Sequence, residues 1–356
     1  MSAQYSTPAP RSPTILSLAQ HLRQVERERP GGVADDLSPL MNQLAFAAKV
    51  LAREINRAAL AAAIPPQCVQ GGTNSTGDNQ TRLDVYANQV VLDAFHRSTR
   101  LAGLVSEEMD ELVVLSEGDR ARIILCIDPI DGSSNTEING SLGTIFGFYR
   151  RERTGPGDLA AELIEGRAPL VAAGYVFYGS GTLLVYSQGE GVRSFLLDRE
   201  LGEFMMCHPD IRCPEEGDSF AANTGRLYEW HPGLQRYIHH ISQRDPATRR
   251  PYSLRYSGAL VADFHRCLLR GGVYFYPSDR GHAEGKLRLF YESAPLAFLV
   301  EQAGGKASDG RSPILPPRAR SIHQRSTLVI GSAREVELIE KFVAEAEPKT
   351  ASAWTI

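Results

Sequence analysis

The sequence predicts a layered α/β fold, also described as α+β, in which helices pack on sheets that contain several strands in succession. Residues 122–225 hold one extended apolar run after another, whereas the flanking segments show the spacing of amphipathic helices. The 42% hydrophobic and 22% charged content is that of an ordinary globular protein. A chain of 356 residues suffices for one large domain or two medium ones.

Composition excludes several classes of protein. The formal net charge of −4 argues against a nucleic-acid-binding protein, which would carry a basic stripe. No stretch approaches the roughly 20 apolar residues of a transmembrane helix, so no membrane partner is expected. Residues 1–13 are polar and rich in Pro and Ser, unlike a signal peptide, so we expect a disordered tail and a cytoplasmic protein.

The five cysteines indicate neither a disulfide framework nor a zinc site, because their number is odd and their spacing irregular. Cys126 and Cys267 are expected in the core. Cys207 and Cys213 are close in sequence. Two separate reduced thiols are the favoured interpretation there, and a redox pair is the alternative.

The N-terminal part is expected to be helical. Ser38 and Pro39 have the N-cap and first-turn pattern of a helix that runs to about Ala63. A Gly-rich loop follows at residues 71–78, and a second helix is expected from Thr81. Its apolar positions recur at helical spacing, at Leu83, Tyr86, Ala87, Val90, Val91, Ala94 and Phe95.

Strands and helices mix in the rest of the chain. The extended runs lie at residues 123–127, 143–149, 171–178, 182–186, 272–276, 287–291 and 326–330. Helices are expected at 259–270 and 292–303, the second ended by two glycines. Ser332 and Glu335 have the pattern of a capping box that opens the final helix.

The octet from Asp128 to Asn135 carries the strongest functional signal. It follows the buried strand 123–127 and presents two carboxylates, a tight Pro/Gly turn, two hydroxyls and a run of backbone N–H groups. Carboxylates bind hard cations such as magnesium, and N–H groups at the start of a turn or helix bind phosphate. The octet therefore favours metal-assisted hydrolysis of a phosphate ester, although Asp-Pro and Asp-Gly also occur in plain loops.

Further acids would complete a metal site. Glu107 and Glu108 form an adjacent pair, which is more often a solvated surface pair, and Glu292 opens a helix, where an acid simply suits the helix dipole. Asp78 and Asp84 flank the end of the Gly-rich loop and the start of its helix. Together these acids would supply oxygens for two or three ions.

Several cations and hydroxyls are candidates for binding an anion. Lys286 and Arg288 are two residues apart, so on a strand they face one side, although a solvated strand face is the alternative. Tyr256 and Tyr276 offer hydroxyl donors, and most tyrosines serve packing alone. His265 and His323 are interpreted as structural, because metal-bound water needs no histidine.

With these residues in place, the chain resembles the class I fructose-1,6-bisphosphatases from about Thr14 to Glu345. The octet alone marks a wider superfamily that includes inositol monophosphatases, whereas the segments 255–256 and 286–292 are much more specific. The resemblance rests on residues 72–78, 83–85, 106–108, 128–135, 143–146, 173–180, 255–258, 285–292 and 322–325.

The resemblance implies a role for each site residue. Magnesium, two or three ions per subunit with Mn²⁺ as a possible substitute, would be held by Glu107, Asp128, the carbonyl of Ile130, Asp131 and Glu292. Glu108 and Asp84 would position or deprotonate the attacking water, and Asp78 would enter from a mobile loop. Substrate would be bound by Asp131, Gly132, Ser133, Ser134, Asn223, Arg255, Tyr256, Tyr274, Phe275, Tyr276, Lys286 and Arg288, with Arg255 reaching into a neighbouring subunit's site.

The resemblance also implies a five-layer α-β-α-β-α sandwich assembled as a homotetramer. An N-terminal domain would span residues 14–215, a C-terminal sugar-binding domain 216–346 and a tail 347–356. The implied reaction is hydrolysis of the 1-phosphate of fructose 1,6-bisphosphate in gluconeogenesis or the Calvin cycle. Alternatives are a sedoheptulose-1,7-bisphosphatase or dual-specificity enzyme, an inositol or nucleotide phosphatase, and a non-catalytic sugar-phosphate sensor.

The chain departs from the family pattern at regulatory positions. In AMP-inhibited relatives a Thr and nearby N–H groups bind the AMP phosphate. Ala34, Asp35 and Asp36 stand there instead, and a Lys-Tyr pair is replaced by Arg122-Ile123. We therefore expect weak or absent AMP inhibition. Arg226 replaces a Tyr near the second phosphate, and the cysteine-bearing insertion of light-regulated chloroplast enzymes is missing, so thioredoxin control is not expected.

Overall fold

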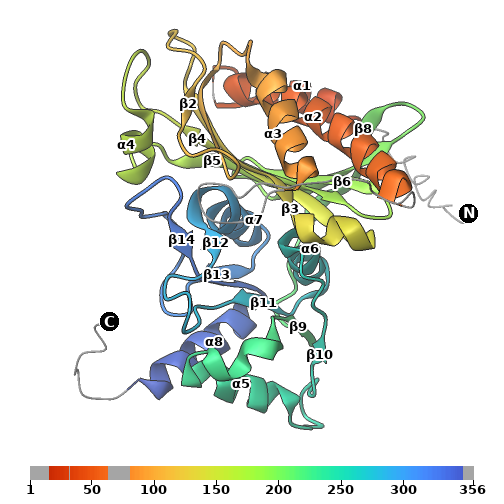
Figure 1. Ribbon diagram of the computed structural model, residues 1–356, viewed down its shortest axis with the longest axis vertical. Helices are drawn as coiled ribbons and strands as arrows, with labels where there is room; N and C mark the ends of the chain where they lie inside the picture. Colours follow the sequence, from red (N-terminus) through yellow and green to blue (C-terminus); the bar gives the residue numbers. More distant parts are fainter. Residues whose placement is uncertain (1–15, 32, 63–80, 348–356) are drawn as a thin grey trace, which may run out of the picture.

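The computed structural model describes residues 16–31, 33–62 and 81–347. Five layers follow one another down the long axis of the molecule (Figure 1). The outermost layer consists of helices α1 (Leu18–Glu28), α2 (Val33–Ala62) and α3 (Arg82–Phe95). An eight-stranded sheet, a middle layer with α6 (Leu260–Arg270) and α7 (Ala294–Gln302), a five-stranded sheet and the pair α5 (Pro232–Ser242) and α8 (Ala333–Ala346) complete the stack. The predicted α-β-α-β-α sandwich is thus confirmed.

The first sheet has the strand order β2-β1-β3-β4-β5-β6-β7-β8, with β1 and β3 parallel and the other neighbours antiparallel. Helix α4 (Leu159–Ile164) joins β4 to β5. The strands are β1 (Leu101–Ser106), β2 (Val113–Val114), β3 (Ile123–Asp131), β4 (Leu142–Arg150), β5 (Leu170–Tyr178), β6 (Thr182–Ser187), β7 (Val192–Asp198) and β8 (Glu203–Ile211).

The second sheet has the order β10-β9-β11-β15-β13, and β12 (Leu287–Arg288) pairs separately with β14 (Arg325–Ser326). Its strands are β9 (Ser219–Ala221), β10 (Ser253–Leu254), β11 (Val273–Tyr276), β13 (Lys306–Ser308) and β15 (Leu328–Gly331). Three short helical turns lie between these elements. They are η1 (Ser133–Ile138) between β3 and β4, η2 (Thr224–Glu229) between β9 and α5, and η3 (Leu289–Ser293) between β12 and α7. The predicted domain boundary at residues 215 and 216 lies in the segment between the two sheets.

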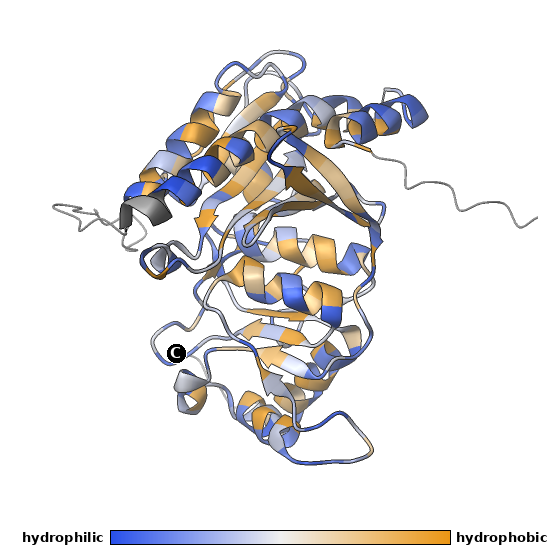
Figure 2. Ribbon diagram, turned by 90° about the vertical axis from the view of Figure 1, so that its right-hand side faces the viewer, coloured by the Kyte–Doolittle hydropathy of each residue, from blue (hydrophilic) through white to orange (hydrophobic). Residues whose placement is uncertain are grey.

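The apolar core lies between the layers, where Figure 2 shows the helices turning their hydrophobic sides toward the sheets. One cluster joins α1, α2 and α3 to the first sheet, and a second joins both sheets through α6 and α7. Because α6 and α7 touch strands of both sheets, the two sheets share one middle layer. Within the described ranges, no helix combines the length and the hydropathy needed to cross a membrane.

Helix α2 begins earlier than predicted. The sequence placed Pro39 in the first turn, but the helix starts at Val33 and Pro39 lies inside it. Proline has no N–H to donate to the carbonyl of Asp35 four residues back. That carbonyl instead accepts a hydrogen bond from Arg100 Nε at 3.1 Å, which lets the helix continue through the proline.

Two other local predictions were wrong. The strand expected at 287–291 ends at Arg288, and residues 289–293 form a π-helical turn that leads into α7. The capping box at Ser332 does not form, although α8 does begin there. Ser332 Oγ donates to the carbonyl of Pro214 at 2.6 Å, and the carboxylate of Glu335 accepts hydrogen bonds from the hydroxyls of Tyr237 and Tyr252.

The cysteines that the structure describes are free thiols, with Cys207 exposed and Cys126, Cys213 and Cys267 buried. Two separate thiols at Cys207 and Cys213 are therefore what the structure has, rather than a disulfide. Cys68 lies outside the described residues.

Two histidines, the buried His21 and the half-buried His265, make stability depend on pH. Burial lowers the pKa of His21 and of His265 to about 4, with Arg193 and His208 adding to the respective effects. The folded protein then keeps both rings neutral down to about pH 4, whereas the unfolded chain protonates them near pH 6.5. Because the unfolded state binds more protons in that window, stability falls as the pH drops from about 6.5 to about 4.

We therefore expect the free energy of unfolding to fall by up to about 2 kcal/mol per buried ring between pH 7 and pH 5. Urea titrations at the two pH values measure this. The H265N variant is expected to show a smaller loss than the wild type, and H96N, at an exposed ring, serves as the control. An equal loss in H265N and the wild type would contradict the assignment.

Candidate active site

The sequence-predicted metal acids gather at one edge of the first sheet. Strands β1 and β3 run parallel, and Ser106 pairs with Ile127, so Glu107 and Asp128 are the next residues on neighbouring strands. The N–H of Glu107 still donates to the carbonyl of Ile127 at 3.1 Å. Glu292 reaches the same edge from η3, which packs against β3. Three chain segments far apart in sequence thus bring carboxylates to one place.

These carboxylates repel one another. Asp128 is 2% exposed and Glu292 is 7% exposed. Burial raises the pKa of Asp128 well above its usual range, and the charges of Glu107, Glu292, Asp131 and Glu108 raise it further. Burial and the charge of Glu107 also raise the pKa of Glu292, against a hydrogen bond from the Arg288 N–H at 2.6 Å. A bound cation would relieve this repulsion.

The donor atoms of the site suit a hard divalent cation, but the side chains do not form a complete coordination shell. Within residues 16–31, 33–62 and 81–347, no three His, Cys, Asp or Glu side chains are gathered closely enough to hold a metal ion. The donors are carboxylate and carbonyl oxygens, which suit magnesium or manganese. Asp84 Oδ1 is buried and accepts no hydrogen bond from a described residue, so an acceptor oxygen remains available beside the octet.

The octet itself forms the expected turn. The N–H of Ile130 donates to Asp128 Oδ1 at 3.0 Å, and the Thr144 hydroxyl donates to the carbonyl of Pro129 at 2.7 Å. Gly132 has φ +77° and opens η1. Ser133 and Ser134 follow in that helical turn and are not buried, so their N–H and hydroxyl groups lie next to the acids.

Asp131 differs from the other acids in what its oxygens do. They accept the N–H groups of Leu260 at 3.1 Å and Val261 at 2.7 Å, at the start of α6. Burial raises the pKa of Asp131 to about 6, while these two hydrogen bonds oppose the rise. In this conformation Asp131 caps α6 and ties the octet to the middle layer. Its binding of metal and substrate stays a prediction.

The predicted water-activating acids lie on both sides of the octet. Asp84 is 2% exposed and forms a capping box with Thr81, in which its Oδ2 accepts the Thr81 N–H at 2.7 Å. Burial raises the pKa of Asp84, and hydrogen bonds from Thr81 and Ser133 oppose this. Glu108 is half-buried directly after Glu107, with its N–H on Ser106 Oγ. Asp78 lies outside the described residues.

A cleft of about 530 Å³ opens beside the acids. It is lined by Glu107, residues 281–286, Arg288, Glu292 and Arg325. Lys286 and Arg288 both line it, although they do not share a strand face, because β12 begins only at Leu287. The Arg288 side chain is almost fully buried and Nη1 donates to the carbonyl of Lys286 at 2.8 Å. Acids and cations thus line the same cleft.

The predicted sugar contacts divide between the two faces of β11. Tyr276 is half-buried, and Tyr274 lies on the same strand face but is 2% exposed. Strand alternation turns the side chain of Phe275 to the other face, against Trp230 and Tyr237 in the outer core, and its contact with substrate stays a prediction. Tyr256 is 38% exposed.

The last two predicted contacts lie at the edge of this region. Asn223 forms the N-cap of η2, and its carbonyl accepts the N–H of Arg226 at 3.1 Å. Arg255 is exposed, and its Nη1 donates to the neighbouring carbonyl of Leu254 at 3.1 Å, which leaves the guanidinium at the surface.

The structure adds three residues that the sequence analysis did not select. His282 and Arg325 line the cleft, and Arg325 pairs with Arg288 across the β12–β14 ribbon. Asp263 accepts the Ser257 N–H with both carboxylate oxygens, at 2.9 and 3.1 Å, and so holds the segment that carries Tyr256. The segment 322–325 was a signal for Arg325. An isolated Asp in a helix gave none for Asp263.

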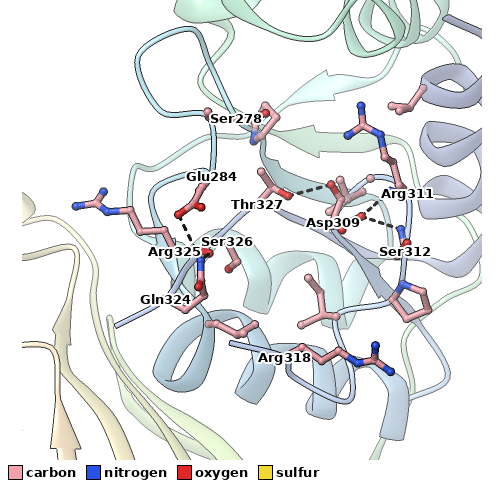
Figure 3. Close-up of a pocket in the computed structure, with 18 of the residues that line it drawn as sticks. Ser278, Glu284, Asp309, Arg311, Ser312, Arg318, Gln324, Arg325, Ser326 and Thr327 are labelled. Atoms are coloured by element: carbon pink, nitrogen blue, oxygen red, sulfur yellow. Dashed lines mark hydrogen bonds between the residues drawn. The ribbon is translucent and has the colours of Figure 1, made fainter. Parts of the chain in front are cut away.

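A larger cavity of about 660 Å³ adjoins the cleft (Figure 3). Gln324 there donates to Glu284 at 3.4 Å, and the Asp309 carboxylate accepts the N–H groups of Arg311 and Ser312. Glu284 and Arg325 border both hollows. The larger cavity lacks the cluster of buried carboxylates, so the smaller cleft is the candidate active site.

Comparisons with known proteins agree with this geometry. The family described as "Fructose-1-6-bisphosphatase, N-terminal domain" matches residues 20–209, and "Fructose-1-6-bisphosphatase, C-terminal domain" matches residues 213–344. A class 1 fructose-1,6-bisphosphatase of Acaryochloris marina is 51% identical over 310 residues, 87% of this chain and 92% of its own. One of Chlorobaculum tepidum is 40% identical over 329 residues, 92% and 98% of the two chains.

Among solved structures, the holo form of Leishmania major fructose-1,6-bisphosphatase superposes with a TM-score of 0.82 at 37% identity. The superposition covers 93% of this chain and 99% of that one. The likeness therefore extends over both sheets and all five layers.

The Gly132 turn gives a test of the site's construction. A Cβ at Gly132 would lie 2.8 Å from the Ala259 Cβ, and φ is +77°. Gly155 has φ +87° with nothing within 4 Å of such a Cβ. We expect G155A to lose roughly 1 to 2 kcal/mol of stability from the backbone alone, and G132A to lose about 3 kcal/mol.

Urea unfolding of both variants measures the difference. Equal losses in G132A and G155A would show that the close approach of the octet to α6 is not a constraint. Phosphatase activity is expected to fall in G132A and to persist in G155A.

Proposed function

This chain belongs to the family of class 1 fructose-1,6-bisphosphatases, and we propose from its site how it hydrolyses fructose 1,6-bisphosphate. The reaction gives fructose 6-phosphate and phosphate. The observation that supports the assignment is the set of mutually repelling carboxylates of buried Asp128 and Glu292 and half-buried Glu107, next to the Gly132 turn and the cations of the cleft.

Magnesium is the cofactor we propose, with two or three ions per subunit and manganese as a substitute. Glu107, Asp128, the carbonyl of Ile130, Asp131 and Glu292 would hold it. Asp131 would first have to share the oxygens that now cap α6. When bound, the metal neutralises phosphate charge, lowers the pKa of water and stabilises the departing alkoxide.

The chain's own residues would orient the substrate phosphate and deprotonate the attacking water. Glu108 and Asp84 would accept the proton of the attacking water, and burial raises the pKa of Asp84, which makes its carboxylate a stronger base. Asp78 would join them from the loop before α3. The N–H groups after Gly132 and the hydroxyls of Ser133 and Ser134 would bind the 1-phosphate, with Arg288 nearby.

The rest of the substrate would lie along the cleft. Asn223, Tyr256, Tyr274, Tyr276 and Lys286 would bind the sugar and the second phosphate. Arg255, exposed at the surface, would serve a neighbouring subunit in a homotetramer. We further propose a cytoplasmic enzyme of gluconeogenesis or the Calvin cycle.

Sedoheptulose 1,7-bisphosphate is the second candidate substrate, because it offers a similar phosphate-bearing end to the same carboxylates. An inositol or nucleotide phosphatase is disfavoured by the Lys286 and Tyr256 segments. A sugar-phosphate sensor without catalysis is disfavoured because Glu107, Asp128 and Glu292 are all present at one edge.

Removing one buried charge tests the activity. We expect D128N to lower phosphate release from fructose 1,6-bisphosphate by about 10³-fold or more, because it removes a ligand worth several kcal/mol in the transition state. Release is measured with and without magnesium, using fructose, sedoheptulose and inositol phosphates. D210N, at an exposed aspartate of β8, is the control. Unchanged turnover by D128N, or no turnover of any substrate by the wild type with magnesium, would refute the proposal.

AMP is expected not to inhibit the enzyme. In the first turn of α2, Asp35 Oδ2 already accepts the Gly31 N–H at 2.8 Å, and Asp36 lies 3.9 Å from Arg100. The resemblance to AMP-inhibited relatives puts the AMP phosphate at these residues, and the two carboxylates would repel it. Steady-state assays with rising AMP measure this, and potent inhibition by AMP would contradict it.

A further inference from the structure

The larger cavity, of about 660 Å³, is not used by the proposed reaction. The described residues to which we assign a role in hydrolysis do not line it. Its volume lies within the range of about 300 to 1,000 Å³ that is usual for small-molecule sites. Buried apolar side chains line it from several elements, namely Leu234 of α5, Leu289 of η3, Ile314, Val329 of β15 and Val343 of α8. A ligand there would bury an apolar body against the protein.

Positive charge predominates among the side chains that line this cavity. Three guanidinium groups, those of Arg311, Arg318 and Arg325, accompany two carboxylates, those of Glu284 and Asp309. Both carboxylates already accept hydrogen bonds within the protein. The cavity is therefore suited to a ligand that carries negative charge.

Arg318 is the cation most available to such a ligand. Its side chain is exposed, and among the residues that the structure describes, none accepts a hydrogen bond from it or forms an ion pair with it. Arg311, by contrast, is paired with Glu347 at 2.7 Å. Figure 3 shows both arginines on the segment that borders the cavity on the right, Arg311 above and Arg318 below. An anionic group of a ligand would find its charge partner at Arg318.

His231 adds an uncharged donor. It is the N-cap of α5, and its Nδ1 accepts the Gly233 N–H at 3.2 Å. Burial lowers the pKa of His231, and the charge of Arg311 lowers it further, so the ring is neutral near pH 7. Because Nδ1 is the acceptor, the proton of the neutral ring lies on Nε2, where no described residue accepts it.

We propose that this cavity is a second binding site, which takes an organic anion with an apolar body. The apolar body would lie against Leu234, Ile314 and Val329. The anionic group, a carboxylate, sulfonate or phosphate, would pair with Arg318, and His231 would donate to a further acceptor of the ligand. Because Glu284 and Arg325 line both hollows, a ligand in the cavity would border the active cleft.

Two fluorescent probes that share one aromatic framework test the charge. 1-Anilinonaphthalene-8-sulfonate carries a sulfonate, and N-phenyl-1-naphthylamine lacks it. We expect the sulfonate to bind the full-length wild type saturably, and R318A to weaken its Kd by about 10-fold, as the loss of one hydrogen bond from a charged group would. The Kd of the uncharged probe should not change. R320A, at an exposed arginine that does not line the cavity, is the matched control.

Filling the cavity tests the location. Ser278 is half-buried and lines the cavity. S278F places an aromatic ring in this space and is expected to abolish binding of both probes, whereas S278A leaves the space open and is expected to bind them like the wild type. Circular dichroism and urea unfolding confirm that each variant is folded.

Competition separates the cavity from the active cleft. Saturating fructose 6-phosphate is expected to leave the sulfonate probe bound. Competitive displacement of the probe by fructose 6-phosphate, an equal Kd in R318A and the wild type, undiminished binding in folded S278F, or no binding by the wild type would each overturn the inference. None of these readouts is hydrolysis, so this inference and the proposed function fail separately.

Discussion

Mutual repulsion among buried carboxylates is the constraint on which this active site depends. Asp128 and Glu292 are nearly inaccessible to water, and each is pushed toward protonation by burial and by the charge of Glu107. A protein gains no stability from like charges placed together in a low-dielectric interior. Their arrangement makes physical sense as a site for a divalent cation that delivers charge to a phosphate, which is the chemistry of the family to which the chain belongs.

The fold brings together three chain segments that are distant in sequence, and each carries one of the repelling carboxylates. The parallel pairing of β1 and β3 puts Glu107 and Asp128 on adjacent strand ends, and the π-helical turn η3 carries Glu292 to them. Asp131 links the octet to α6, and α6 and α7 join the two sheets. The acids at the edge of the first sheet and the tyrosines of β11 in the second sheet therefore belong to one connected structure.

Hydrophobic periodicity predicted most strands and helices, and motifs of known chemistry pointed to acids that share the sheet edge. The five layers were expected only from the resemblance to the family. Sequence patterns failed where contacts with residues distant in sequence determine the local structure. Pro39 is tolerated within α2 because a distant Arg100 satisfies the carbonyl that proline leaves open. Ser332 donates its hydroxyl to the carbonyl of Pro214 instead of forming a capping box. Phe275 faces the outer core because its position in β11 determines the side of the sheet to which its side chain points. None of these partners is local in the sequence.

Above all, we propose that the acids at the end of β3 form the divalent cation site. Calorimetric titration of Mn²⁺ into the wild type and into D128N, both saturated with inorganic phosphate, tests it most directly, with D210N as the control. We predict Mn²⁺ binding by the wild type and D210N and its loss in folded D128N. Equal Mn²⁺ affinity in D128N and the wild type would contradict it.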